Sequence, residues 1–188
     1  MGFNERKVAQ MAAFFLGQSN GKMPHLKLMA LLYLSDREAM RAFGWTISGD
    51  SLISISRGPV LLQALKLMNG DAKSQSGEWE KWISDDGNDV LSLCQNIDAG
   101  DALRELSQAD IETLKAVWDK FGTMDKWAIC YWTRKNCAEW KNPNGGPYRP
   151  IQYDALARAV GFDDASAKEV AAQIQSEQEI DRLFRGLR

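Results

Sequence analysis

The stretch from Leu26 to Leu34 reads LKLMALLYL, which is apolar on nearly all sides of a helix. We expect it to lie within a helix from Pro24 to Phe43, because proline suits a first helical turn and Gly44 can end the helix. A helix that is apolar all round is typical of a core centre. The sequence therefore predicts that the other elements pack around this one.

Further helices are predicted from apolar residues at helical spacing together with capping signals. Asn4 and Thr123 are expected N-caps, Ser107 and Ser166 each begin a capping box, and Gly58-Pro59 and Pro150 are expected to open helices. In chain order we expect these helices over 4–16, 59–68, 107–122, 124–135, 150–160 and from 166 into the 180s.

Two segments change to the period of two that is typical of strands. Ile53 and Ile55 alternate with serines, and Ile83 is separated from Val90–Leu93 by the turn sequence Asp-Asp-Gly-Asn. We therefore predict a mainly α fold of the α+β class, with six to seven helices and one or two short β-hairpins. The length of 188 residues suits a single domain over residues 1–188.

The composition favours binding over catalysis, because the chain has seven Trp and only one His. No spacing joins His25 to Cys94, Cys130 or Cys137 as a nucleophile pair or a zinc site. The paired acids Asp85-Asp86 and Asp163-Asp164 lie in turn or cap positions, and no phosphate-binding glycine loop occurs. We expect no catalytic residue, no metal and no cofactor.

The sequence shows no pattern of a membrane span or a signal peptide. We therefore expect a cytoplasmic protein with reduced thiols. The basic pair Arg134-Lys135 beside Trp132 and Trp140 could form a nucleic-acid surface, but the net charge of −2 and the lack of a basic stripe argue against it. Tryptophan is enriched at protein interaction hot spots. We expect Trp118 in the core, and Trp79, Trp82, Trp132 and Trp140 on a partner face.

Three motifs follow one another in the first third of the chain. Lys27–Asp36 reads KLMALLYLSD, Gly44–Asp50 reads GWTISGD, and Arg57–Val60 reads RGPV. In this order and spacing they resemble the opening of the Panacea domain, the SocA-like (GepA-like) antitoxin family of bacteria and phages. The resemblance extends to about residue 160. It departs from the family pattern at Ala30, Arg57 and Arg134, where the family often has lysine, an aromatic residue and histidine.

The resemblance implies a module that neutralises a protein toxin by direct binding. Members of the family inhibit structurally unrelated toxins, and at least one delivers its toxin to a protease. The motif residues expected to be structural are Lys27, Gly49, Asp50, Gly58 and Pro59. The residues expected to bind a partner are Tyr33, Asp36 and Arg37, at a less buried edge of their helix, with Trp79, Trp82, Trp132, Arg134 and Trp140.

Three hypotheses follow. The first is a cytoplasmic antitoxin that is not an enzyme, whose partner is a protein toxin encoded by an adjacent gene, with a protease as second partner if it acts as an adaptor. The second is an interaction protein of a phage or mobile element that binds a host defence or regulatory protein. The third is a metal-dependent hydrolase that uses Asp36 or Asp50. The neighbouring gene separates the first two, and metal-dependent turnover would support the third.

Overall fold

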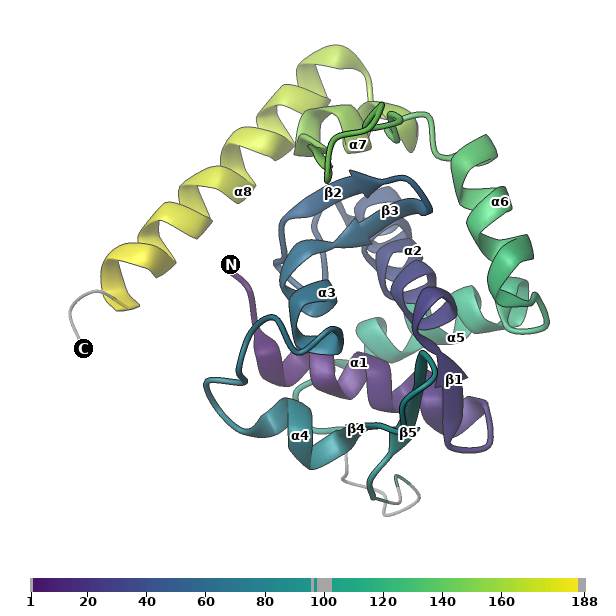
Figure 1. The fold of residues 1–188 in the computed structure, drawn as a ribbon. Helices are drawn as coiled ribbons and strands as arrows, with labels where there is room; N and C mark the ends of the chain where they lie inside the picture. Colours follow the sequence, from purple (N-terminus) through teal and green to yellow (C-terminus); the bar gives the residue numbers. More distant parts are fainter. Residues whose placement is uncertain (1, 96, 98–102, 186–188) are drawn as a thin grey trace.

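A computed structural model describes residues 2–95, 97 and 103–185 of the chain. Helices predominate in this part, and the strands form two small antiparallel sheets (Figure 1). The elements in chain order are α1 (Glu5–Gln18), β1 (Lys22–Pro24), α2 (His25–Phe43), β2 (Leu52–Ile55), β3 (Gly58–Leu61), α3 (Leu62–Met68), α4 (Glu78–Trp82), β4 (Ile83–Asp85), β5 (Val90–Leu93), α5 (Gln108–Phe121), α6 (Lys126–Asn136), β6 (Arg149–Pro150), α7 (Tyr153–Ala159) and α8 (Asp164–Arg185). The predicted mainly α fold with small hairpins is confirmed, with eight helices in the described part.

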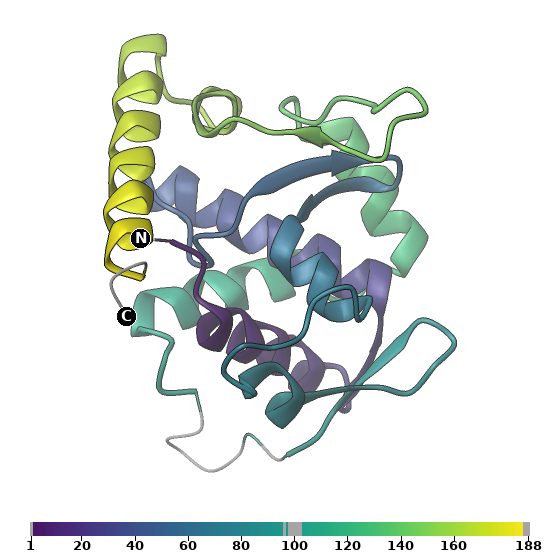
Figure 2. The same ribbon diagram turned by 60° about the vertical axis from the view of Figure 1, so that its left-hand side comes forward.

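Helix α2 lies at the centre of the molecule, as predicted. It contacts α1, α3, α5, α6, α7 and strand β3, and Figures 1 and 2 show it surrounded by these elements. Leu28, Leu31, Leu32 and Tyr33 have no exposed surface. Burial of each such side chain contributes about 1.5–3 kcal/mol to folding. The continuous apolar surface of this helix therefore organises the core.

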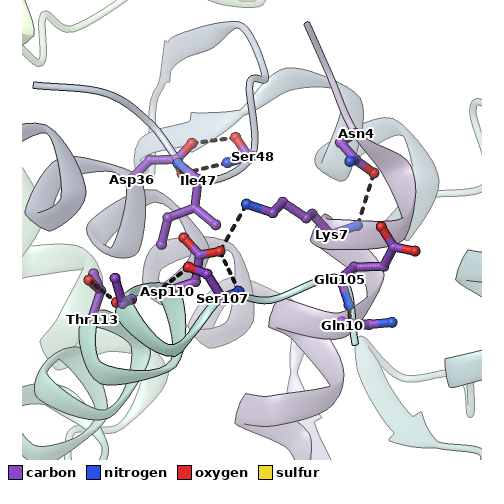
Figure 3. Close-up of polar contacts among 11 residues, drawn as sticks. Asn4, Lys7, Gln10, Asp36, Ile47, Ser48, Glu105, Ser107, Asp110 and Thr113 are labelled. Atoms are coloured by element: carbon purple, nitrogen blue, oxygen red, sulfur yellow. Dashed lines mark hydrogen bonds and ion pairs between the residues drawn. The ribbon is translucent and has the colours of Figure 1, made fainter. Parts of the chain in front are cut away.

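A buried ion pair joins α1 to α5 beneath this centre. Lys7 Nζ lies 2.8 Å from Asp110 Oδ2, and Asp110 also accepts a hydrogen bond from the backbone N–H of Ser107 (Figure 3). Ser107 accepts in return from the Asp110 N–H, which completes the predicted capping box. Because Asp110 serves both the cap and the ion pair, the start of α5 is fixed against α1.

The first sheet has the order β1-β5-β4, and it contains the predicted hairpin between Ile83 and Leu93. The second has the order β3-β2-β6, in which Ser54 pairs with Pro59. The prediction that Gly58-Pro59 opens a helix is wrong, since these residues begin β3. Pro59 is tolerated because β3 is an edge strand, where a missing N–H removes no essential ladder bond. Helix α3 begins four residues after Gly58.

Three other helix starts differ from the prediction. Asp125, rather than Thr123, caps α6, because its carboxylate accepts hydrogen bonds from the N–H groups of Trp127 and Ala128. Helix α8 begins at Asp164, and Asp163 accepts from the Ser166 N–H. Pro150 lies in β6, whose pairing with β2 delays α7 until Tyr153.

Candidate partner-binding surface

Asp36 holds the loop that follows α2. Its Oδ1 accepts hydrogen bonds from the backbone N–H groups of Ile47 at 2.8 Å and Ser48 at 3.0 Å, and Oδ2 accepts from the Ser48 hydroxyl (Figure 3). The side chain is completely buried, and burial raises its pKa to about 7 against the opposing effect of these hydrogen bonds. Asp36 is therefore a buried anchor, and the prediction that it lies at a less buried edge is wrong.

Asp50 holds the next turn of the same loop. Its carboxylate accepts from the N–H groups of Gln63 and Ala64 at 3.0 Å, which caps the first turn of α3. Its carbonyl oxygen accepts a 2.7 Å hydrogen bond from the Tyr153 hydroxyl on α7, and that hydroxyl accepts from Gln178 on α8. Gly49 precedes it with a φ of 63°, in the left-handed region that suits glycine. This turn therefore links α3 to the two C-terminal helices.

Tyr33 and Arg37, one turn apart on α2, share one buried acceptor. The Tyr33 hydroxyl donates to Glu139 Oε1 at 2.6 Å, and Arg37 Nε donates to the same oxygen at 2.8 Å. The Glu139 side chain has no exposed surface. The prediction that Tyr33 lies at a less buried edge of its helix is therefore wrong, because the hydroxyl reaches an internal carboxylate that sequence spacing did not reveal.

Lys27 and Gly58, two of the motif residues, also have structural roles. Lys27 Nζ donates a 2.7 Å hydrogen bond to the Gly122 carbonyl oxygen and lies 5.3 Å from the Trp118 ring centroid. Gly58 has a φ of 143°, and a Cβ there would lie 2.8 Å from Thr133 Oγ1. The strand β3 can thus approach α6 only because residue 58 lacks a side chain.

Asp36, Asp50 and His25 are the acidic and histidine residues that we considered for catalysis or metal binding. The carboxylates of Asp36 and Asp50 accept from backbone and hydroxyl groups, and no group of three His, Cys, Asp or Glu in the described residues could hold a metal ion. His25 is mostly buried. Its Nε2 lies 3.7 Å from Asp85 Oδ1, because the β4–β5 hairpin packs beside the start of α2.

Helix α6 presents aromatic and cationic side chains to solvent. Trp127 and Tyr131, one turn apart, are 54% and 58% exposed. Arg57, between β2 and β3, lies 4.9 Å from the Trp127 ring centroid, and Lys135 lies 5.8 Å from that of Tyr131. Helix α6 has no acidic residue. We call Arg57, Trp127, Tyr131, Arg134 and Lys135 the α6 face.

A family comparison covers α6 and the buried motif network, by which we mean Tyr33, Asp36, Asp50 and Glu139 with their hydrogen-bond partners. The family described as antitoxin SocA-like, Panacea domain, matches residues 28–141, which is more than half of the chain. The chain belongs to this SocA-like family. No curated protein and no solved structure matches it. The match extends from the first turn of α2 to the residue after Trp140, so most of the SocA-like motif residues can be interpreted directly from the contacts above.

The structure separates the predicted partner-binding residues of this SocA-like domain into two groups. Arg37, Trp132 and Arg134 remain accessible in part, on or beside α6. Trp79 and Trp82 are 5% and 3% exposed, since α4 packs on α1 and both indoles point into the core. The expectation that these two form an exposed face is wrong. The charged residues around them occupy the outer side of α4.

Trp140 is half-buried, and its Nε1 donates a 2.9 Å hydrogen bond to the Ile55 carbonyl oxygen. Trp118 packs against the core, as expected. Sequence reasoning left Trp127 and Tyr131 out of the predicted set. Their spacing of four on a helix with three basic residues and no acid is the signal that could have identified them.

Proposed function

We propose that this SocA-like protein is an antitoxin that neutralises a protein toxin by direct contact and has no catalytic role of its own. Family membership supports the antitoxin role. The observation that carries the binding mode is the α6 face, where exposed Trp127 and Tyr131 alternate with cations. We place the complex in the cytoplasm. None of the described helices has the length and apolarity that crossing a membrane requires.

The chemistry of the α6 face suits a protein partner. Trp, Tyr and Arg are the residues most enriched at binding hot spots, and Trp and Tyr bury a large area at a low entropic cost. The Trp127 ring already lies beside Arg57 and Lys126, so its orientation is restrained before binding. Preorganised side chains lose less conformational freedom on association.

The absence of catalysis is supported by how the acidic motif residues are used. A general acid, general base or metal ligand needs an oxygen that can reach a substrate or ion. Asp36 and Asp50 direct their oxygens to N–H and hydroxyl groups of their own chain. They therefore act in this proposal as internal acceptors.

The experiment is co-expression with the product of the adjacent gene. We expect the wild-type chain to relieve its toxicity and to form a complex on gel filtration. The double variant W127A/Y131A should lose both properties while it remains folded. Trp45→Ala is the matched control, because Trp45 is 52% exposed but stacks on Phe43 at the end of α2, away from α6.

Two outcomes would count against the proposal. Toxicity that persists with no complex would contradict the pairing, and equal losses in W45A and W127A/Y131A would contradict the role of the α6 face. The half-life of the toxin after co-expression distinguishes blocking from delivery to a protease, since only delivery shortens it.

A further inference from the structure

A groove between α2, α5 and α6 lies next to the α6 face. Its volume is about 320 Å³, and Arg37 and Arg41 from α2, Lys120 from α5 and Trp132 from α6 are among its lining residues. We propose that this groove receives an acidic segment of the partner protein that carries an apolar anchor residue. This inference rests on the proposed function and names the chemistry of the partner at that site.

The floor of the groove is apolar and aromatic. Phe121 and Trp132 meet edge to face with ring centroids 4.6 Å apart, and Leu34 and Val117 are buried beside them. A volume of this size is at the lower end for small-molecule pockets, so it suits one or two side chains. An aliphatic or aromatic side chain on this floor would be removed from water, which is the usual basis of an anchor residue.

The rim of the groove is cationic. Lys120 Nζ lies 5.1 Å from the Trp132 ring centroid and 5.2 Å from that of Phe121, and no described carboxylate lies within ion-pair distance of it. Arg37 donates a hydrogen bond from Nε to Glu139, and its Nη1 has no acceptor within the described residues. Arg41 pairs with Glu38, the one acidic side chain that lines the groove in the described part of the chain.

Because Arg37 and Arg41 are paired with Glu139 and Glu38, the charge that favours an acidic partner is that of Lys120. Lys120 is a cation held over an aromatic floor with no counter-ion among the described residues, so a carboxylate placed there would gain a charge-assisted hydrogen bond, which the partly water-excluded setting strengthens. A single-stranded nucleic acid would need a cationic track several nucleotides long and an exposed stacking platform. The floor rings here are buried or half-buried, so the observations favour a protein segment.

The test uses a phage-displayed library of random 12-residue peptides selected against the whole chain. We expect enriched peptides to contain two or more Asp or Glu beside one Leu, Phe or Trp. A fluorescein-labelled enriched peptide should bind Lys120→Glu at least tenfold more weakly than wild type. Lys120→Met keeps the apolar stem and should also weaken binding, by less.

Lys115→Glu is the matched control, because Lys115 is exposed on the same helix and does not line the groove. Binding that is equal in wild type and K120E, enrichment of peptides without acids, or no enrichment would each overturn the inference. Binding of a labelled oligothymidine that K120E abolishes, with no peptide enriched, would assign the groove to nucleic acid instead.

The two proposals can fail separately. If K120E still neutralises the toxin as well as wild type, the groove inference fails and the antitoxin role stands. If the acidic peptide binds through Lys120 but co-expression never relieves toxicity, the groove inference stands and the proposed function fails.

Discussion

The hydroxyl of Tyr33, in the middle of α2, donates a 2.6 Å hydrogen bond to Oε1 of Glu139, three residues beyond the end of α6. Arg37 donates to the same oxygen at 2.8 Å. One buried carboxylate therefore binds the chain after α6 to the central helix. The position of the α6 face depends on this contact.

The first prediction concerns Glu139. Glu139→Ala leaves the partly buried Arg37 guanidinium and the fully buried Tyr33 hydroxyl without the acceptor that they share, which should lower the free energy of unfolding by about 3–5 kcal/mol. Glu139→Gln keeps an acceptor and should cost less. Urea unfolding followed by circular dichroism measures both. The exposed Glu80→Ala is the control, and an equal effect there would contradict this interpretation.

The second prediction concerns Asp36. Asp36→Ala leaves the N–H groups of Ile47 and Ser48 and the Ser48 hydroxyl without an acceptor, and each unsatisfied buried group costs about 1–3 kcal/mol. We expect D36A to be among the most destabilised single variants in urea. Asp36→Asn retains one acceptor oxygen and should be milder. Wild-type stability of D36A would show that the loop does not depend on this carboxylate.

The third prediction is a pH dependence. Burial raises the pKa of Asp36 to about 7 and that of Asp50 to about 6, from an ordinary value of 3.8. Between pH 4 and 7 the folded chain thus binds more protons than the unfolded chain. The free energy of unfolding should fall as pH rises through this range and level off above about 7.

Exposed carboxylates do not produce the predicted change in unfolding free energy between pH 4 and 7. Hydrogen bonds and cations lower the pKa values of Asp86, Asp125, Asp163 and Asp164, so their contribution is lost only in stronger acid. Urea unfolding at pH 5, 6, 7 and 8 measures the profile. D36N should flatten it, and stability that rises between pH 5 and 7 would contradict the prediction.

The fourth prediction concerns Gly58 and Thr133. Gly58→Ala places a Cβ 2.8 Å from Thr133 Oγ1 at a φ of 143°, so we expect a loss of about 2–4 kcal/mol in unfolding free energy. Gly21→Ala is the control, because Gly21 also has a positive φ, of 80°, but a Cβ there would meet nothing within 4 Å.

Thr133→Ala removes the clashing oxygen and should recover part of the loss. The double variant G58A/T133A should therefore be about 1 kcal/mol more stable than the sum of the single losses implies. Strict additivity would show that backbone strain, rather than the approach of β3 to α6, accounts for the need for glycine.

The elements with strong local signals were predictable from the sequence. The Leu26–Leu34 stretch predicts a central helix, and the Ser107 capping box and the Asp85–Asn88 turn are where they were expected. The edge strand at Pro59 was not predictable, because a proline before an apolar run suits a helix start as well as an edge strand. Only its pairing with Ser54 decides between them.

The candidate site was less predictable, since burial depends on distant partners. Tyr33 and Asp36 lie on a helix whose spacing says nothing of Glu139 or of the Ile47 and Ser48 N–H groups. Trp79 and Trp82 share one side of a short helix, but whether that side meets water depends on α1.

The separation of the buried motif network from the α6 face has a consequence for engineering. Replacing exposed side chains at positions 127, 131, 134 and 135 disturbs no hydrogen bond of Asp36, Asp50 or Glu139. The domain can therefore serve as a framework in which one helix is randomised, as antibody loops are, to select binders for chosen proteins.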